Sequence, residues 1–295
     1  MNNEERLELR HLRYFRVVAE ELHFGRAATR LAVSQPSLSV QIRHLEDIVG
    51  ATLLERHTRH VELTDAGHAL MDASTRVLRD VAEAVEQTRR AAAGEVGVLR
   101  IGFGPTLMLS NLAQVIRSYR HRHPRVRLEL RELAAAEQQD ALVRGDLDIG
   151  FVRGPEAHPG LHVELFAREP LVIAVSRDHP KARARRLPLS ALAEEPWVLF
   201  PRVIAPEFHD QVLRLCRDAG FTPRVVQESR EVHTTVGLVG AGIGVTIVPD
   251  TVRRMAGADV VYHPVPRAWV RLSIVRPSGT PRAVVQTFLD VVARR

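Results

Sequence analysis

The sequence predicts an α/β protein that carries a winged helix-turn-helix in front of a long helix and a two-lobed α/β region. Three observations lead to this prediction. Apolar residues recur every three or four positions across residues 9–49, heptad spacing continues along a single helix to Ala93, and apolar strands alternate with helical segments after Gly97. A chain of 295 residues has room for three parts, which we place at 1–67, 68–96 and 97–295.

The composition is that of an ordinary globular protein. Hydrophobic residues make up 45% and charged residues 26% of the chain, and no apolar run approaches the ~20 residues that a membrane helix needs. The polar, acidic start of the chain lacks the basic and apolar stretches of a secretory signal, so we expect a cytoplasmic protein with no membrane partner. A single cysteine, Cys216, excludes an internal disulfide and a multi-cysteine zinc site, and we expect neither a metal nor a cofactor.

The net charge of +6 does not by itself indicate DNA binding. Residues 1–95 hold 13 Arg, no Lys and 15 Asp or Glu, a net charge of −2, so the rest of the chain carries +8. The excess of positive charge therefore lies outside the helix-turn-helix. Any contact with DNA must depend on a few residues that project from one element.

Three helices and a β-ribbon are predicted in residues 1–67. The first helix spans 9–22, the second starts with Gly25 as its N-cap, and the third starts with Ser34 as its N-cap and Pro36 in its first turn. The buried stripe of the third helix consists of Leu38, Ile42, Leu45 and Val49. Two short runs form the ribbon, or wing, at 52–56 and 61–63.

A long helix follows from residue 64 to residue 93, ~45 Å in length at 1.5 Å per residue. Its apolar and small residues fall at the a and d positions of heptads, namely Leu70, Ser74, Val77, Val81, Ala84, Thr88 and Ala91. So thin an apolar seam on so long a helix predicts that the helix pairs with a second copy of the chain.

After Gly97 the pattern predicts a βαβαβ unit and then a second series of strands. The first unit has strands at 98–104, 126–133 and 147–152, with helices that end at His123 and Arg144. The later strands are predicted at 171–175, 197–200, 224–227, 244–248, 260–265 and 270–275, and the later helices at 207–219 and 281–294. Two chain crossings then give lobe I, 97–166 plus 268–295, and lobe II, 167–267.

The first 67 residues resemble the LysR-type transcriptional regulators in LRYFRVVAEE, GRAATRLAVSQPSLSVQIRHLE and LTDAG, and the resemblance continues through GDLDIGFVR, EPLVIAVSRDHP and GLVGAGIGVTIVP. It implies a sequence-specific DNA-binding transcriptional regulator, not an enzyme, with an effector domain of the periplasmic-binding-protein type. It also implies a homodimer or homotetramer, with RNA polymerase as a candidate partner. Within the family the chain looks most like regulators of aromatic-acid catabolism. Gly25 and Val40 depart from the usual capping and polar residues, so no operator sequence is carried over.

The predicted base contacts are Pro36, Val40, Arg43 and His44, on the face of the third helix opposite its buried stripe, together with Gln35 at the N-terminal end of the helix. Glutamine pairs bidentately with adenine, arginine pairs with guanine, and valine can rest on a thymine methyl, so this face suits readout of double-stranded DNA in the major groove. Arg59, at the tip of the wing, suits a narrow minor groove. Phosphate contacts are predicted at Ser34, Ser37, Ser39, Arg56 and Thr58.

Ligands of open α/β lobes gather at the carboxyl ends of strands and at helix N-termini, so we place an effector site between the lobes. The candidate residues are Pro105, Thr106, Leu107, Ala135, Pro201, Arg202, Val203, Thr234 and Thr235. Thr106 and Thr234 can donate to a carboxylate, Arg202 adds positive charge, and alanines with Val203 leave an apolar space. The predicted effector is a small carboxylate, with an aromatic ring as one form of its apolar part.

Two other functions fit parts of the sequence. An α/β enzyme with a DNA-binding head would need a catalytic motif, but we find no well-placed H-x-x-H pair, G-x-S-x-G elbow or phosphate loop. The glycines of residues 237–244 close a helix rather than open one, unlike a dinucleotide loop. An architectural DNA-binding protein with an inert C-terminal half would bind no small molecule.

Overall fold

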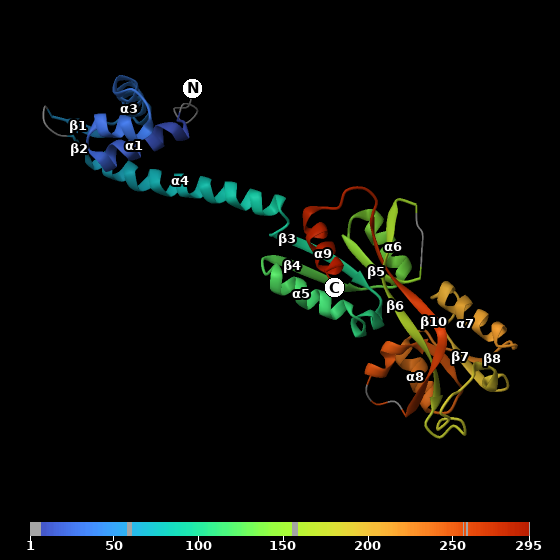
Figure 1. Ribbon diagram of the computed structural model, residues 1–295. Coiled ribbons are helices and arrows are strands. Elements are labelled where there is room, and N and C mark those ends of the chain that lie inside the picture. Colours follow the sequence, from blue (N-terminus) through green and yellow to red (C-terminus); the bar gives the residue numbers. More distant parts are fainter. Residues whose placement is uncertain (1–6, 58–60, 155–158, 256, 258, 295) are drawn as a thin grey trace. The chain divides into compact units, whose positions relative to one another are not determined.

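The computed structural model describes residues 7–57, 61–154, 159–255, 257 and 259–294 (Figure 1). The chain divides into two compact units, Met1–Arg89 and Arg90–Arg295. The border between them falls inside the long helix α4 (Asp65–Ala92).

The first unit contains three short helices and a β-ribbon. The helices are α1 (Leu9–Glu21), α2 (Phe24–Leu31) and α3 (Gln35–Val49), and the ribbon strands are β1 (Leu54–Arg56) and β2 (Val61–Leu63). The helices pack around Phe15, Leu38 and Ile42, which are fully buried. The strands pair in antiparallel register, with Glu55 opposite Glu62. The predicted order of three helices and a wing is confirmed.

Two local predictions in this unit are wrong. The N-cap of α2 is His23 rather than Gly25, because the imidazole Nδ1 accepts the backbone N–H groups of Gly25 and Arg26 at 3.1 and 3.2 Å. In α3 the fourth buried residue is Ile48, whereas Val49 is 41% exposed. At 100° per residue, Val49 lies closer than Ile48 to the line of Leu38, Ile42 and Leu45, so the helical period does not explain this difference. The burial of Ile48 reflects the packing at the last turn of α3, just before its C-cap Gly50.

The helix α4 has 28 residues, and only Gly67 and Ser74 among them are buried within the single chain. The residues of the predicted seam are otherwise at least partly open to solvent, and Val77 is 42% exposed. Gly67 lies so close to the ribbon that a Cβ atom there would be 2.2 Å from the carbonyl oxygen of Leu53. The start of α4 is therefore packed, and the later turns expose their apolar side chains.

The second unit is built on a six-stranded sheet with the order β4-β3-β5-β10-β6-β9. Its strands are β3 (Gly97–Phe103), β4 (Val126–Glu132), β5 (Ile149–Arg153), β6 (Leu161–Ser176), β9 (Thr246–Pro249) and β10 (Val260–Pro277). The strands β3, β4 and β5 are parallel, and α5 (Leu112–Arg122) and α6 (Ala135–Arg144) connect them. The predicted βαβαβ unit is thus present.

Two strands are much longer than predicted. The first half of β6 is half-exposed, so it lacks the apolar run that the prediction at 171–175 used. The predicted strands at 260–265 and 270–275 are one strand, β10, which pairs with β6 on both sides of an irregularity between Pro264 and Trp269. Arg267, inside this irregularity, has a φ of +58°.

Two clusters of buried side chains form the two lobes of this unit. One surrounds Phe151 and Phe288 and includes α5 and α9 (Ala283–Ala293). The other surrounds Trp197 and Ile247 and includes α7 (Pro206–Asp218) and α8 (Val232–Gly240), beside the small sheet of β7 (Pro196–Leu199) and β8 (Arg224–Glu228). Because β6 and β10 contribute to both cores, these two strands connect the lobes.

The described residues of the second unit also include the short 3-10 helices η2 (Pro105–Leu109), η3 (Leu189–Leu192) and η4 (Asp250–Arg254). Within the described part of the chain, no helix has both the length and the apolar character needed to cross a bilayer.

Candidate nucleic-acid interface and ligand cavity

One face of α3 is open to solvent and carries most of the predicted base contacts. Gln35, Pro36, Val40, Arg43 and His44 are all exposed, and Val40 reaches 58% although it is apolar. The opposite face is buried in the core of the unit. The ring of His44 lies edge to face with that of the buried His11 at 5.4 Å, which links the exposed face to α1.

The three serines at the start of α3 differ in their hydrogen bonds and in their exposure to solvent. The Ser34 side chain is the N-cap, and its hydroxyl accepts the N–H of Ser37 at 3.3 Å. Ser37 is exposed, whereas Ser39 is partly buried. A hydroxyl at a helix start remains close to free backbone N–H groups, which is a suitable place for a phosphate oxygen.

Arg56 has protein partners in the single chain. Its guanidinium carbon lies 4.7 Å from the centre of the Phe24 ring, and Nη2 lies 3.5 Å from Glu46 Oε2. The other carboxylate oxygen of Glu46 accepts the N–H groups of Leu53 and Leu54. Arg56 therefore helps hold the ribbon against α2 and α3, and its contact with a phosphate stays a prediction. The predicted contacts at Thr58 and Arg59 lie outside the described residues.

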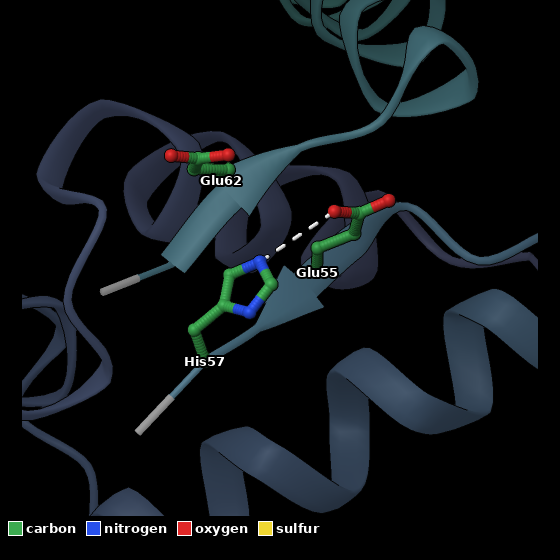
Figure 2. Close-up of side chains that lie close together, drawn as sticks. All are labelled: Glu55, His57 and Glu62. Atoms are coloured by element: carbon green, nitrogen blue, oxygen red, sulfur yellow. Dashed lines mark ion pairs between the residues drawn. The ribbon is translucent and has the colours of Figure 1, made fainter. Parts of the chain in front are cut away.

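The ribbon brings together Glu55, His57 and Glu62, as Figure 2 shows. Their ligand atoms lie within 4.8 Å of one another, and His57 Nε2 is 3.6 Å from Glu55 Oε2. All three residues are exposed, and the antiparallel register alone places the two glutamates opposite each other. Like charges in that position destabilise a strand pair.

A cavity of about 370 Å³ lies where strands end and helices begin in both lobes of the second unit. From lobe I it is lined by the start of η2, the β4–α6 turn and the end of β5. From lobe II it is lined by Phe200, the start of α7, the start of α8 and Pro249. The ends of parallel strands and helix N-termini are the usual places for ligands in this type of fold.

Arg153, at the end of β5, is the most constrained charge in the cavity wall. Its Nε and Nη2 donate to Glu169 Oε2 at 3.2 and 3.1 Å, and Nη1 donates to the Thr106 hydroxyl oxygen. The side chains of Arg153 and Glu169 are 18% and 5% exposed. Because Thr106 accepts from Arg153, its own O–H is left to donate to a ligand.

Four carboxylates also line the cavity: Glu132, Glu137, Glu207 and Glu231. Glu137 and Glu207 lie in the first turns of α6 and α7, and Glu231 is the N-cap of α8. At α6 the Ala134 N–H donates to Glu137 Oε2 at 2.9 Å. Acidic residues are favourable at helix N-termini, and their negative charge weakens the attraction of these three helix ends for a further anion.

The nine predicted effector residues divide into two groups. Thr106, Leu107 and Ala135 line the cavity, and Pro105 belongs to the same 3-10 helix as Thr106. The cavity lining does not include Pro201, Arg202, Val203, Thr234 or Thr235. Arg202 is paired with Asp210 by two bonds of 2.9 Å, Val203 is 85% exposed, and the buried Thr235 donates to the Glu231 carbonyl.

The sequence analysis missed Arg153, Glu207 and Arg230. Arg153 directly follows the predicted strand 147–152, so the rule that ligands meet strand ends would have included it. Glu207 and Arg230 stand just before or within the start of a helix, which the same rule covers. Arg153 on β5 pairs with Glu169 on β6, and these two strands are separated in the sheet by β10. No local sequence pattern indicates this pairing.

The thiol of Cys216 is not a candidate nucleophile. Cys216 is fully buried, and burial raises the pKa of its thiol to about 12, so the nucleophilic thiolate is not formed near neutral pH.

The glycine cluster lies where the chain passes from α8 to β9. Gly240 ends α8, and Gly242 and Gly244 lead into β9, as predicted for a turn rather than a nucleotide loop.

In a comparison with known proteins, both parts of the chain match models of the same protein family. The family model for the bacterial regulatory helix-turn-helix protein, lysR family, matches residues 9–68, and that for the LysR substrate binding domain matches residues 92–295. The HTH-type transcriptional regulator AlsR of Bacillus subtilis (strain 168) is 41% identical over 257 residues, which are 87% of this chain and 85% of AlsR.

Two solved structures are similar as well. The crystal structure of full-length CbnR complexed with the target DNA has a TM-score of 0.84 at 31% identity, covering 98% of this chain and 99% of that chain. The BenM effector binding domain with its effector benzoate has a TM-score of 0.60 at 29% identity, covering 67% of this chain and 90% of that chain. BenM of Acinetobacter baylyi (strain ATCC 33305 / BD413 / ADP1) is itself 37% identical over 260 residues, 88% of this chain and 85% of BenM.

Proposed function

Because this chain belongs to the LysR family of bacterial regulatory helix-turn-helix proteins, and is a DNA-binding transcriptional regulator with an effector-binding domain rather than an enzyme, we propose how it reads DNA and what it senses. The exposed face of α3 enters the major groove of an operator, and a small carboxylate in the cavity modulates the response. The observation that carries the DNA half is the exposed set of Gln35, Val40 and Arg43 opposite the buried face of α3.

Gln35 and Arg43 read bases, and Val40 contacts a thymine methyl. Ser34, Ser37, Ser39, Arg56 and Thr58 position the domain on phosphates, and Arg59 enters the minor groove. CbnR, whose structure with its target DNA is similar over 98% of this chain, supports binding through this unit.

The test compares Gln35→Ala with the natural chain on two duplexes, after the operator has been selected from a random-sequence library. We expect Gln35→Ala to lose roughly 1 to 3 kcal/mol of binding on the selected duplex and little on a scrambled one. Ser37→Ala serves as the control, because the loss of a phosphate contact weakens binding to both duplexes alike. An equal loss on both duplexes for Gln35→Ala would reduce Gln35 to a positioning residue.

The carboxylate binds at Thr106 and Arg153, the donors at the start of η2 and at the end of β5. BenM, whose effector domain is similar to this one, binds benzoate, which supports an acid as the ligand class. Thr106→Val keeps the shape of the side chain and removes the hydroxyl. We expect this variant to bind the operator normally and to lose the response to the effector; unchanged induction would remove Thr106 from the site.

We further propose that the protein acts in the cytoplasm, where its operator is, and that it assembles through α4 into dimers. Contacts between effector domains complete a homotetramer, and RNA polymerase is a partner at the promoter. The exposed apolar residues of α4 support the dimer.

A further inference from the structure

We propose that the cavity selects a monocarboxylate whose far end carries a hydrogen-bond donor, a hydroxyl or an amino group, and that it rejects dicarboxylates. This inference rests on the proposed function, because it takes the carboxylate at Thr106 and Arg153 as its starting point. It is carried by the balance and the placement of charges around the cavity.

The part of the cavity beside Arg153 and Thr106 has donors for one anionic group. Arg153 is the cation there, and the buried carboxylate of Glu169 already balances its charge across bonds of 3.2 and 3.1 Å. The remaining attraction for a ligand comes from the Thr106 O–H and the N–H groups of Arg153 that Glu169 and Thr106 leave unused. A single carboxylate satisfies these donors, and a second one finds no further cation beside them.

The rest of the charged wall is acidic. The exposed Glu132, Glu137 and Glu231 and the half-buried Glu207 stand against one further cation in the lining, Arg230, which is exposed as well. At the α6 N-terminus the carboxylate of Glu137 accepts the Ala134 N–H, and its negative charge weakens the attraction of this helix end for an anion. An anionic group near these carboxylates meets repulsion, and repulsion grows where water is partly excluded.

Glu207 brings one of these carboxylates close to Arg153. Gly154 follows Arg153 and has a φ of +96°, and a Cβ atom on it would lie 2.1 Å from Glu207 Oε2. The carboxylate from lobe II therefore packs directly against the backbone at the end of β5 in lobe I. Only glycine allows so close an approach, and Glu207 is half-buried there. A ligand that reaches from Arg153 toward lobe II meets this carboxylate.

A hydroxyl or amino group fits the same wall well. Carboxylates are acceptors only, so a donor on the ligand gains a charge-assisted hydrogen bond where a second carboxylate would be repelled. Phe200, Phe208, Val232 and Leu107 leave the middle of the cavity apolar, which suits a short hydrocarbon or aromatic body.

The experiment measures binding of two matched pairs of acids to the full-length chain by titration calorimetry. The aromatic pair is 4-hydroxybenzoate and terephthalate, and the aliphatic pair is 4-hydroxybutyrate and succinate. We expect the hydroxy acid to bind at least tenfold more tightly than the diacid in the pair whose body fits the cavity. Glu207→Gln combined with Glu231→Gln keeps the shape of both side chains, and it should reduce this ratio to less than threefold. Glu228→Gln, on the exposed strand β8 and outside the cavity lining, is the control and should leave the ratio unchanged.

Three results would overturn the inference, and they are distinguishable. If a diacid binds as tightly as its hydroxy acid, the selection is wrong while the carboxylate assignment stands. If the double variant keeps the full ratio, the acidic wall is not its cause. If none of the four acids binds, the carboxylate assignment itself fails, and the inference fails with it.

Discussion

Two residues without glycine's freedom end helices in the left-handed region. Leu22 closes α1 with a φ of 47°, and Ala32 closes α2 with a φ of 56°. For an L-residue this conformation is less favourable than the right-handed one by roughly 1 to 2 kcal/mol, and glycine is the residue that usually adopts it. The turn before α3 therefore holds a small amount of strain.

Ala32→Gly relieves this strain. Since Ala32 is exposed and loses no packing, we expect the free energy of unfolding to rise by about 0.5 to 1 kcal/mol, measured by urea unfolding of the full chain. Ala32→Val is the matched opposite, because a β-branched side chain is least tolerated at positive φ, and it should destabilise the chain. A loss of stability in Ala32→Gly would contradict the explanation.

Two acidic residues of the DNA-binding unit, Glu55 and Glu62, face each other on the ribbon. Their negative charge is therefore carried by the wing and not by the exposed face of α3. We expect Glu62→Gln to strengthen binding about two- to threefold on every DNA sequence alike, because it removes one repulsion from phosphates.

This gain should shrink as salt is raised from 50 to 200 mM, since ions screen the repulsion. Fluorescence anisotropy on selected and scrambled duplexes measures both effects. Glu83→Gln, at an exposed site on α4, is the control for total charge. A gain restricted to the selected duplex would show that Glu62 affects base readout instead.

At the scale of elements, periodicity predicted well wherever one face of an element is buried. The helices α1 to α4 and the parallel strands β3, β4 and β5 were found because their apolar residues repeat at 3.6 or run continuously. The first half of β6 was missed because its half-exposed residues include charged ones. The cap by His23 was missed because histidine is not among the usual capping residues.

The cavity was predicted in place but only partly in composition. Thr106, Leu107 and Ala135 follow strand ends in lobe I, where the loops are short and the rule applies directly. In lobe II the loop after β7 carries Pro201, Arg202 and Val203 out of the lining, and Glu207 takes the place beside Arg153. Such approaches join residues more than 50 positions apart, so local patterns do not reveal them.

A hydrogen bond between two short helices connects the lobes beside this cavity. Arg254 Nη1, in η4 of lobe II, donates to the carbonyl oxygen of Leu109 at 2.5 Å, at the end of the η2 helix that also carries Thr106. We expect Arg254→Ala to weaken carboxylate binding about fivefold, because η2 loses a restraint, and to leave operator affinity unchanged.

The neighbouring arginine provides a matched control. Arg253 bonds to Asp250 and to the Tyr262 carbonyl, both within lobe II. Arg253→Ala should therefore leave carboxylate binding, measured by titration calorimetry, at the level of the natural chain. An effect of the same size in both variants would indicate general loosening of η4 rather than a link between lobes.

At the scale of the whole molecule, α4 decides the assembly. Val77 is 42% exposed and Val81 is partly exposed in the single chain, although both are apolar. We expect Val77→Asp with Val81→Asp to place charges in the proposed seam, to lower the sedimentation coefficient and to weaken operator binding at least tenfold, since one subunit then engages one half-site.

The control for this variant is Thr75→Asp with Arg79→Asp, which changes exposed positions of α4 outside the predicted seam. This chain should sediment as the natural protein does. A full oligomer with normal operator binding in Val77→Asp with Val81→Asp would mean that another surface makes the dimer.

The two chain crossings between the lobes are the strands β6 and β10, and they are bonded to each other from Val260 with Ser176 to Pro277 with Leu161. Any rotation of one lobe against the other must twist this whole ribbon, because no single bond acts as a free pivot. The paired strands β6 and β10 therefore resist twisting along their whole length. The stretch around Arg267, where the pairing is interrupted, resists it least. If a bound ligand rotates one lobe against the other, we expect these two strands to twist, and their untwisting then favours the return of the lobes when the ligand leaves.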